Sequence, residues 1–428
     1  MRVEDTDRER STDAAVKAIF DGLRWLDLVA DEEPVFQFSR ADRHRAVVNE
    51  LLERGGAYRD FTSAEETGRL RDLAKAERRT FESPWRDREP TVDDLGQPHV
   101  VRFRRPLPGK VTVEDEVQGT VSWSNDDLDD LVLLRSDGAP TYNLAVVVDD
   151  HDMGVTHVIR GDDHLNNAAR QSLIYDALGW TRPVFAHIPL IHGPDGAKLS
   201  KRHGAQAVHE YAEMGYLPEA MRNYLARLGW AHGDEELFSD AQAREWFDLT
   251  GVGKAPARLD FDKLAHVNAH WIRLADDARL ARMTLDVHLA RGHALRPDDE
   301  TRLLQAMPYI KDRAKTLLEL ADQSAFALKV RPLTIFEKAL PMLTGESGER
   351  IGRLRDRLRL FASWDVFALE AELKVFAEEE AVGFGKIGPA VRAALTGDGV
   401  SPDIAKTLAA LGREESLGRL DDALQQTI

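Results

Sequence analysis

The stretch from Val155 to Arg202 constrains the fold more than any other part of the chain. It contains a β-branched run at Val155–Ile159, an apolar segment with helical spacing from Leu165 to Leu178 that stops at Gly179, and a second apolar run at Val184–Ile191. This order predicts a strand, a helix and a strand. Such units are parallel and right-handed, so the carboxyl ends of both strands lie at one edge of a sheet.

A polar cluster follows each of these strands. Arg160–His164 (RGDDH) comes after the first strand, and Lys198–Arg202 (KLSKR) follows the second. Ligands of parallel α/β sheets bind beyond the carboxyl ends of the strands. The sequence therefore predicts that the two clusters meet across one cleft.

Length and composition limit the class of protein. A chain of 428 residues is expected to form two or three domains, and 43% hydrophobic with 31% charged residues is typical of a soluble globular protein. No run of eighteen apolar residues occurs and the amino end is charged, so we expect a cytoplasmic protein without membrane contact. The absence of cysteine excludes disulfides, a Cys-ligated structural zinc and a thiol nucleophile.

The net charge of -17 argues against a general nucleic-acid binder. Two basic runs, Arg69–Arg79 and Arg350–Arg359, interrupt this acidic chain. For either run alone, solvated helix faces that carry ion pairs are the favoured interpretation.

The remaining periodicity indicates how the chain is organised. Residues 46–138 contain short alternating segments typical of antiparallel strands and are interpreted as an insertion between two halves of a parallel sheet. Beyond residue 276 nearly all the periodicity is helical, which predicts a separate all-α domain. Val3–Glu4 resembles the end of a strand whose beginning is absent, so we expect the chain to be truncated at its amino end or to start downstream of its natural start.

Several side chains near the predicted cleft have two interpretations. Lys198 and Lys201 suit a clamp around a polyphosphate, or they belong to an exposed basic loop. Arg160 can hold a substrate carboxylate bidentately, or it forms an ion pair with a neighbouring aspartate. Glu4 can accept a substrate ammonium. Tyr142 lines the cleft, or it is a core tyrosine with a satisfied hydroxyl group.

A different class of function rests on clustered acids and histidines. Asp149–Asp152 and Asp162–His164 contain the residue types that bind divalent ions, so a metal-dependent hydrolase is an alternative. This alternative leaves Lys198, Lys201 and the helical half of the chain unexplained.

The ordered set of motifs resembles the bacterial type of glutamyl-tRNA synthetase, a class I synthetase. The motifs are Val3–Ser11 (VEDTDRERS), Pro140–Ala145 (PTYNLA), Val158–His164 (VIRGDDH), Lys198–Arg202 (KLSKR), Phe384–Gly388 (FGKIG) and Ala393–Gly397 (AALTG). The set spans nearly the whole chain and is far more specific than any one of its members.

The resemblance implies an α/β fold with four parts. They are a Rossmann-type parallel-sheet catalytic domain (residues 1–45 and 139–192), an inserted α+β acceptor-binding domain (46–138), the KLSKR loop with a stem-contact region (193–275) and an all-α anticodon-binding domain (276–428). It also implies ATP-dependent activation of L-glutamate with Mg²⁺, transfer to tRNA(Glu), and a monomer.

Roles for individual residues follow from the resemblance alone. It implies that Arg160 binds the side-chain carboxylate of glutamate, that Glu4 binds its ammonium and that Tyr142 lines the pocket. Lys198 and Lys201 would act in catalysis on a mobile ATP loop. Further ATP contacts are implied for Asp163, His164, Leu190, Ile191 and Ser200, and anticodon contacts for Ser401, Pro402 and Ile404.

Two departures from the family pattern bear on activity. The tetrapeptide similar to His-Ile-Gly-His that supplies the other ATP signature is absent, together with the roughly 35 residues expected of a strand, turn and helix. Some relatives carry a Cys-ligated zinc in the insertion, which this chain cannot. We therefore expect this chain to be inactive or nearly so, and a non-catalytic tRNA-binding remnant is the alternative function.

Overall fold

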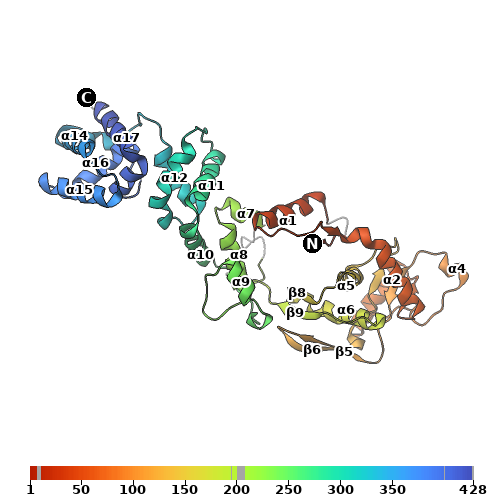
Figure 1. The fold of residues 1–428 in the computed structure, drawn as a ribbon. Helices are drawn as coiled ribbons and strands as arrows, with labels where there is room; N and C mark the ends of the chain where they lie inside the picture. The colour runs from red at the N-terminus through yellow and green to blue at the C-terminus, as the bar shows by residue number, and fades with distance from the viewer. Residues whose placement is uncertain (7–10, 194, 200–207, 400, 427–428) are drawn as a thin grey trace. The chain divides into compact units, whose positions relative to one another are not determined.

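A computed structural model describes residues 1–6, 11–193, 195–199, 208–399 and 401–426 (Figure 1). The chain divides into two compact units, Met1–His209 with Leu225–Leu259, and Glu210–Tyr224 with Asp260–Ile428. The division falls within two helices, α7 (Val208–Glu213) and α8 (Pro218–Gly229). The second unit includes parts of α7 and α8 and the whole of α10 (Phe261–Leu274), all of which precede residue 276, where the predicted helical half begins.

A four-stranded sheet carries the predicted strand–helix–strand unit in the first unit (Figure 1). Its order is β6-β5-β9-β8, and its strands are β5 (Lys110–Asp115), β6 (Gly119–Ser124), β8 (His157–Gly161) and β9 (Val184–Ile188). β8 and β9 are parallel, with Arg160 opposite His187. β5 also runs parallel to β9, and it pairs with β6 in the antiparallel direction.

Helix α6 (Leu165–Leu178) connects β8 to β9 and packs on the sheet through Ala168, which contacts Val113 and Phe185. Gly179 follows the helix with φ 71°, a left-handed conformation that glycine adopts without steric cost. The predicted parallel strand–helix–strand unit, including the position where its helix ends, is confirmed.

Two smaller sheets complete the strands of this unit. β1 (Arg2–Val3) pairs in parallel with β2 (Val35–Phe36). β3 (Ala57–Asp60), β4 (Val100–Phe103) and β7 (Val132–Leu134) form an antiparallel sheet in the order β3-β4-β7.

One hydrophobic core joins the predicted insertion to the helices that flank the parallel sheet. It contains Val47 and Leu51 of α2, Phe103 of β4, Leu144 of α5 and Ile174 of α6, all of which are buried. The α-helices of the first unit not yet bounded are α1 (Asp13–Trp25), α2 (Ala41–Glu53), α3 (Ala64–Ala76), α4 (Val92–Leu95), α5 (Tyr142–Asp152) and α9 (Asp240–Trp246). The range 46–138 stays a prediction, and the structure adds that its strands β5 and β6 extend the sheet of β9.

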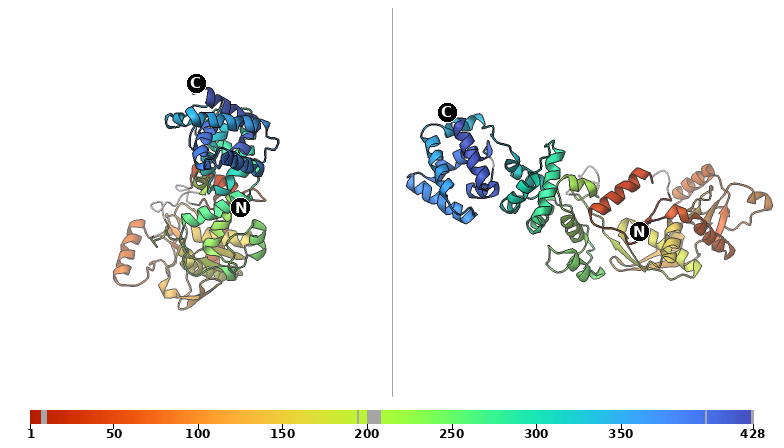
Figure 2. Two further views of the ribbon diagram at one scale, coloured as in Figure 1. Left: turned by 90° about the vertical axis from the view of Figure 1, so that its left-hand side faces the viewer. Right: turned by 45° about the horizontal axis from the view of Figure 1, so that its top comes forward.

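The second unit has no β-strand among its described residues. Besides its parts of α7 and α8, its α-helices are α10 (Phe261–Leu274), α11 (Asp277–Ala290), α12 (Asp299–Ile310), α13 (Leu317–Ser324), α14 (Gly345–Leu360), α15 (Val366–Glu379), α16 (Phe384–Thr396) and α17 (Ile404–Gln425), and Figure 2 shows the last four, in blue, gathered into one bundle. Gly412, with φ 74°, interrupts α17 with a kink. The combination of a parallel-sheet unit and a helical unit confirms the predicted fold class.

Short 3₁₀ segments fill several connections. They are η1 (Gln37–Arg40), η2 (Asn125–Asp127), η3 (Asp162–His164), η5 (Leu249–Gly251), η6 (Lys311–Arg313), η7 (Ala325–Leu328) and η8 (Glu337–Leu343). The apolar spacing of Ile335–Leu343 predicts an α-helix, but the structure has the 3₁₀ segment η8 there. Pro341 lies inside it, and proline supplies no N–H for the hydrogen bonds of an α-helix.

Candidate active site

A cavity of about 850 Å³ runs along β8, from Val155 before the strand to Gly161 at its carboxyl end, and reaches Asp163 and Leu190 beyond the ends of β8 and β9. Its lining includes six of the residues predicted from the sequence, namely Glu4, Tyr142, Arg160, Asp163, His164 and Leu190. They come from the segment after β1, from α5, from β8 with the turn after it, and from the segment after β9. The predicted meeting of the two polar clusters is confirmed, because Lys198 Nζ lies 3.1 Å from Asp163 Oδ2.

Arg160 lies in β8 and is held by neutral hydrogen-bond partners. Its Nε donates to Nε2 of His187 (3.1 Å), and its Nη2 donates to Oε1 of Gln171 (2.9 Å). Within the described residues, no carboxylate lies within ion-pair distance of Arg160, so the alternative of an ion pair with Asp162 or Asp163 is not found there. A guanidinium in this state is suited to an anionic ligand.

Glu4 lines the cavity but shares a cation with a buried acid. Oε1 of Glu4 accepts a hydrogen bond from Nη2 of Arg2 (3.1 Å), and Nη1 of Arg2 lies 2.7 Å from Oδ1 of Asp150. Burial raises the pKa of Asp150, and the negative charge of Glu4 acts in the same direction, while Arg2 opposes both. Arg2 is fixed by the pairing of β1 with β2. One guanidinium thus faces two acids, which leaves negative charge at Glu4 that a substrate ammonium can bind.

Tyr142 is the first residue of α5, and its phenol lines the cavity. Its hydroxyl lies 3.4 Å from Nδ1 of His164. Burial raises the pKa of Tyr142, and so does Glu4, whereas Arg160 lowers it. Of the two interpretations of Tyr142, the structure agrees with the one in which its ring lines the cavity. The valines that follow are core residues, as predicted, with Val147 and Val148 fully buried.

The segment after β9 folds back on itself and brings Lys198 to the turn after β8. Leu199 N donates to the carbonyl of Ile191 (3.0 Å), and Gly193 N donates to the carbonyl of Ala197 (2.8 Å). The hydrogen bond from Lys198 lowers the pKa of Asp163. Ser200 and Lys201 lie outside the described residues, so their predicted roles stay predictions.

Three buried or half-buried groups that the sequence analysis missed position Arg160. They are His187 of β9, Asp115 at the end of β5 and Gln171 of α6. Burial lowers the pKa of His187, and Arg160 acts in the same direction, while Asp115 opposes both. The strand pattern around Asp115 was visible, but nothing local in the sequence indicates that its strand pairs with β9.

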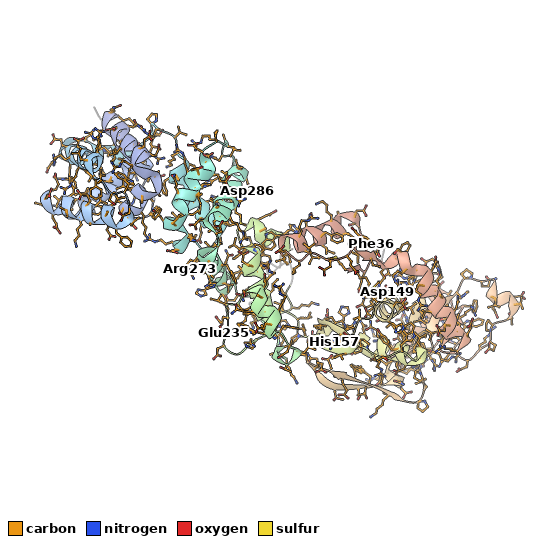
Figure 3. All side chains as sticks on the ribbon, in the orientation of Figure 1. Phe36, Asp149, His157, Glu235, Arg273 and Asp286 are labelled. Carbon is orange, nitrogen blue, oxygen red and sulfur yellow. The ribbon has the colours of Figure 1, made fainter. Side chains whose placement is uncertain are left out.

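The acidic residues that suggested a metal site have basic partners: Asp150 pairs with Arg2, Asp163 pairs with Lys198, and Asp149 and Asp152 bind residues of η1 and α2. Asp149, on α5 (Figure 3), is fully buried and accepts hydrogen bonds from Arg40 Nε (2.6 Å) and His44 Nε2 (2.8 Å). Asp152 is bound by Arg40 and Arg43. No three His, Asp or Glu side chains in the described part of the chain are arranged to hold a metal ion. The geometry therefore gives the hydrolase alternative no support.

The basic run on α14 is neutralised by acids of the same unit. Its five arginines, Arg350, Arg353, Arg355, Arg357 and Arg359, all form ion pairs, with partners that include Glu380, Glu372 and Asp421. The interpretation of this run as a helix face with ion pairs is confirmed.

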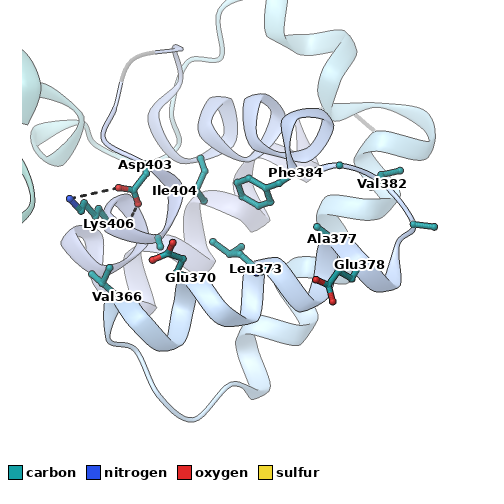
Figure 4. Close-up of a pocket in the computed structure, with 14 residues that line it drawn as sticks. Val366, Glu370, Leu373, Ala377, Glu378, Val382, Phe384, Asp403, Ile404 and Lys406 are labelled. Carbon is teal, nitrogen blue, oxygen red and sulfur yellow. Dashed lines mark hydrogen bonds and ion pairs between the residues drawn. The ribbon is translucent and has the colours of Figure 1, made fainter.

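The predicted anticodon residues lie where α16 connects to α17. Ser401 Oγ accepts a hydrogen bond from Arg392 Nε (3.1 Å), and Arg392 Nη2 lies 3.4 Å from the carbonyl oxygen of Pro402. Ile404 lines a cavity of about 820 Å³ together with Leu373 and Phe384 (Figure 4). Ser401 and Pro402 thus contact an arginine, whereas Ile404 is buried, with 2% of its surface exposed.

Residues 1–266 match the model of a family described as tRNA synthetases class I (E and Q), catalytic domain. The chain belongs to this family of class I tRNA synthetases. Residues 276–424 match a second model, described as an anticodon binding domain, which lies within the helical unit.

Curated relatives of this synthetase chain are similar over nearly their whole length. A glutamate–tRNA ligase of Caulobacter vibrioides is 61% identical over 424 residues, which cover 99% of this chain and 90% of that protein. A glutamate–tRNA ligase of Bradyrhizobium sp. (strain ORS 278) is 56% identical over 430 residues, covering 99% and 90%.

A solved structure shows the same fold. The glutamate tRNA ligase from Elizabethkingia meningosepticum, in complex with its amino acid, has a TM-score of 0.83 and 28% identity, covering 100% of this chain and 92% of that one. None of the helices in the described part of this synthetase is long and apolar enough to span a membrane.

Proposed function

We propose that this chain ligates L-glutamate to tRNA(Glu) in an ATP-dependent reaction. Its membership of the class I synthetases for E and Q and the names of its relatives support this proposal. The observation that carries the choice of substrate is Arg160, a cation inside the cavity whose described hydrogen-bond partners are His187, Gln171, Tyr142 and a backbone carbonyl rather than acids. Such a group is suited to the side-chain carboxylate of glutamate.

The reaction proceeds in two substitutions. An oxygen of the substrate α-carboxylate attacks the α-phosphorus of ATP, and the bond from that phosphorus to the pyrophosphate oxygen breaks. A hydroxyl of the terminal tRNA ribose then attacks the carbonyl carbon of the adenylate and releases AMP. In the first step negative charge builds up on the departing pyrophosphate, so cations near it lower the barrier.

Each residue of the site has a task in this scheme. Arg160 binds the side-chain carboxylate, Glu4 the ammonium, and Tyr142 closes the wall between them. Lys198 and Lys201 stabilise the charge on the pyrophosphate. We assign Mg²⁺ to the nucleotide, because no described group of three protein ligands forms an ion site and Mg²⁺ is commonly held through substrate phosphates.

Aminoacylation with labelled glutamate tests the proposal directly. We expect impaired transfer to tRNA(Glu), with tRNA(Gln) assayed in parallel, and a correspondingly low glutamate-dependent exchange of pyrophosphate into ATP with tRNA present, because this sequence does not contain the tetrapeptide similar to His-Ile-Gly-His. A second measurement does not require turnover: calorimetric titration with a sulfamoyl analogue of glutamyl-adenylate, with the aspartyl analogue as control. Binding of neither analogue would overturn the assignment of the site. Binding of tRNA alone, without either analogue, would favour a non-catalytic tRNA-binding protein.

The helical unit is proposed to bind the anticodon. The match of residues 276–424 to an anticodon binding domain supports this, and Ser401, Pro402 and Ile404 are the proposed contacts. Occupancy by one chain per tRNA and a monomeric state are further expectations, which light scattering of the complex would measure.

A further inference from the structure

Three side chains from three neighbouring strands form a continuous hydrogen-bonded row. Asp115 ends β5, His187 lies in β9 and Arg160 lies in β8, and the strands are adjacent in the order β5-β9-β8. His187 Nδ1 lies 2.5 Å from Asp115 Oδ2, and Arg160 Nε lies 3.1 Å from His187 Nε2. The side chains of Asp115 and His187 are both 0% exposed. The row therefore connects a buried carboxylate to the guanidinium of the cavity.

The hydrogen bond from Arg160 selects one tautomer of a neutral His187, against the carbonyl group of His164, which also interacts with the ring. Nε of an arginine is always a donor, so Nε2 of His187 must accept and carry no proton. The remaining ring proton is then on Nδ1, where it donates to Asp115. This is the usual way in which one partner of a histidine fixes the role of its other nitrogen.

Backbone hydrogen bonds fix the orientation of the Asp115 carboxylate, so that its second oxygen accepts the hydrogen bond from Nδ1 of His187. Its Oδ1 accepts from three backbone N–H groups, those of Val117 (3.0 Å), Gln118 (2.8 Å) and His187 (3.0 Å). Oδ2 is thereby directed to the imidazole. Gln118 also donates from Nε2 to the carbonyl of His187 (2.8 Å), which ties the turn after β5 to β9.

The other side of the guanidinium is held as well. Nη2 of Arg160 donates to Oε1 of Gln171 (2.9 Å), whose Nε2 donates to Oδ1 of Asn143 (3.2 Å). The plane of the guanidinium is thus fixed by two acceptors on different elements, β9 and α6. A fixed plane matters because bidentate binding of a carboxylate requires a defined orientation of the arginine fork.

We propose that Asp115 and His187 are positioning residues that orient Arg160 for the side-chain carboxylate of the amino-acid substrate, through the Nδ1–H tautomer of His187. This inference rests on the proposed function, in which Arg160 binds that carboxylate. Neither residue touches the substrate. Their effect is on the affinity for glutamate, transmitted through one acceptor atom.

The substitution Asp115→Asn tests the tautomer with almost no change in shape. The three backbone donors keep the amide oxygen at the Oδ1 position, so the new NH₂ group faces Nδ1 of His187. Nδ1 of His187 must then accept a hydrogen bond, so the ring proton moves to Nε2. There it points at the N–H of Arg160, and neither group can accept a hydrogen bond from the other. We expect KM for glutamate to rise roughly 10- to 100-fold, the range for a buried donor that loses its acceptor, with KM for ATP unchanged.

The matched control removes a neighbouring charge from the same strand. Glu114 is exposed on β5, and its carboxylate accepts from Thr120 Oγ1 without contacting the row. Glu114→Gln should leave KM for glutamate at the wild-type value. If KM for glutamate rose equally in Glu114→Gln and Asp115→Asn, net charge, and not the tautomer of His187, would control the affinity for glutamate.

A double substitution separates positioning from a general loss of structure. In His187→Gln the amide oxygen can accept from Arg160 whichever residue occupies position 115. Adding Asp115→Asn to this variant should therefore raise KM for glutamate no further. The same fold-rise in both backgrounds would show that Asp115 acts on the fold alone and would overturn the proposal.

The tautomer of His187 can also be measured spectroscopically, without an activity assay. In the protein labelled with ¹⁵N-histidine, the signal that disappears in His187→Gln belongs to this residue. We expect it to show protonated Nδ1 and bare Nε2 in the wild type, and the reverse in Asp115→Asn. Wild-type protein with protonated Nε2 would refute the inference even if it charges tRNA. The expected tautomer in a protein that binds no glutamate would instead refute the proposed function.

Discussion

Lys198 Nζ lies 3.1 Å from Oδ2 of Asp163, so a cation of the segment after β9 contacts the turn after β8. The side chains are 62% and 42% exposed, and ion pairs of such exposure contribute only about 0–1 kcal/mol to stability. Lys198 can therefore exchange this partner for a phosphate at little cost. The contact is suited to a resting position of an ATP-binding lysine.

Lys198→Ala should slow adenylate formation without weakening the fold. Because charge on the pyrophosphate is greatest in the transition state, we expect the activation rate to fall by about 10²- to 10³-fold and KM for ATP to change much less. Pyrophosphate exchange at several ATP concentrations measures both quantities. Lys254→Ala, at an exposed position, is the control. If the activation rate and KM for ATP changed equally, Lys198 would bind ATP in the ground state and would not stabilise the transition state in particular.

Arg160→Ala should abolish binding of glutamate and leave tRNA binding intact. The substitution removes the proposed partner of the carboxylate, and the imidazole of His187 and the amide of Gln171 lose their donor. Arg160→Lys should also fail, since one ammonium cannot reproduce the planar fork. Calorimetry with glutamate and filter binding with tRNA measure the two effects, and Arg69→Ala, on the exposed face of α3, is the control. Wild-type affinity for glutamate in Arg160→Ala would contradict the assignment.

The sequence predicted those parts of the site that lie close together along the chain. The strand, helix and strand around α6 have their own apolar periodicities, and Gly179 marks the helix end by its left-handed conformation. Such strand–helix–strand units are parallel and right-handed. The approach of Lys198 to Asp163 then follows from geometry, and the structure shows it.

The partners of Arg160 could not be predicted in the same way. Asp115 lies 72 residues before His187 in the chain, and the pairing of β5 with β9 leaves no periodic signal in either segment. Gln171 is a polar residue on a helix, which the pattern alone would place on a solvent-exposed face, yet it is buried against Arg160. Parallel pairing and the burial of polar groups are decided by tertiary packing and not by local propensity.

Asp149→Asn should destabilise the first unit, and the effect should depend on pH. Burial raises the pKa of Asp149, but hydrogen bonds from His44, Arg40 and Gln37 outweigh it, so the pKa lies below the ordinary 3.8. A depressed pKa contributes stability that is present above pH 3.8 and is lost as the pH falls through the folded-state value. At pH 7 we expect a loss of about 3–5 kcal/mol in the free energy of unfolding, the range for breaking a buried ion pair.

Urea denaturation from pH 7 down to pH 3 measures this difference. The difference in free energy of unfolding between wild type and Asp149→Asn should stay constant while the carboxylate is charged. This difference should become smaller below pH 3.8. Asp137→Asn, in an exposed turn, should show no such difference. A difference that does not become smaller in acid would mean that the charge of Asp149 is not what stabilises the contact between α2 and α5.

Arginines of the helical unit should differ in their effect on tRNA binding according to their partners. Arg353 is paired with Glu380, and hydrogen bonds from Arg353 and Arg350 outweigh burial and lower the pKa of Glu380 to about 2. Arg392 has no acidic partner among the described residues and contacts Ser401 and Pro402. Because binding to phosphates releases counterions, we expect Arg392→Ala to weaken tRNA binding and to reduce the salt slope by about 1. Arg353→Ala should leave affinity and slope unchanged in filter binding over a range of salt concentrations. If Arg353→Ala weakened tRNA binding and Arg392→Ala did not, the tRNA would bind on the face of α14. Ser401, Pro402 and Ile404 would then no longer belong to the proposed anticodon site.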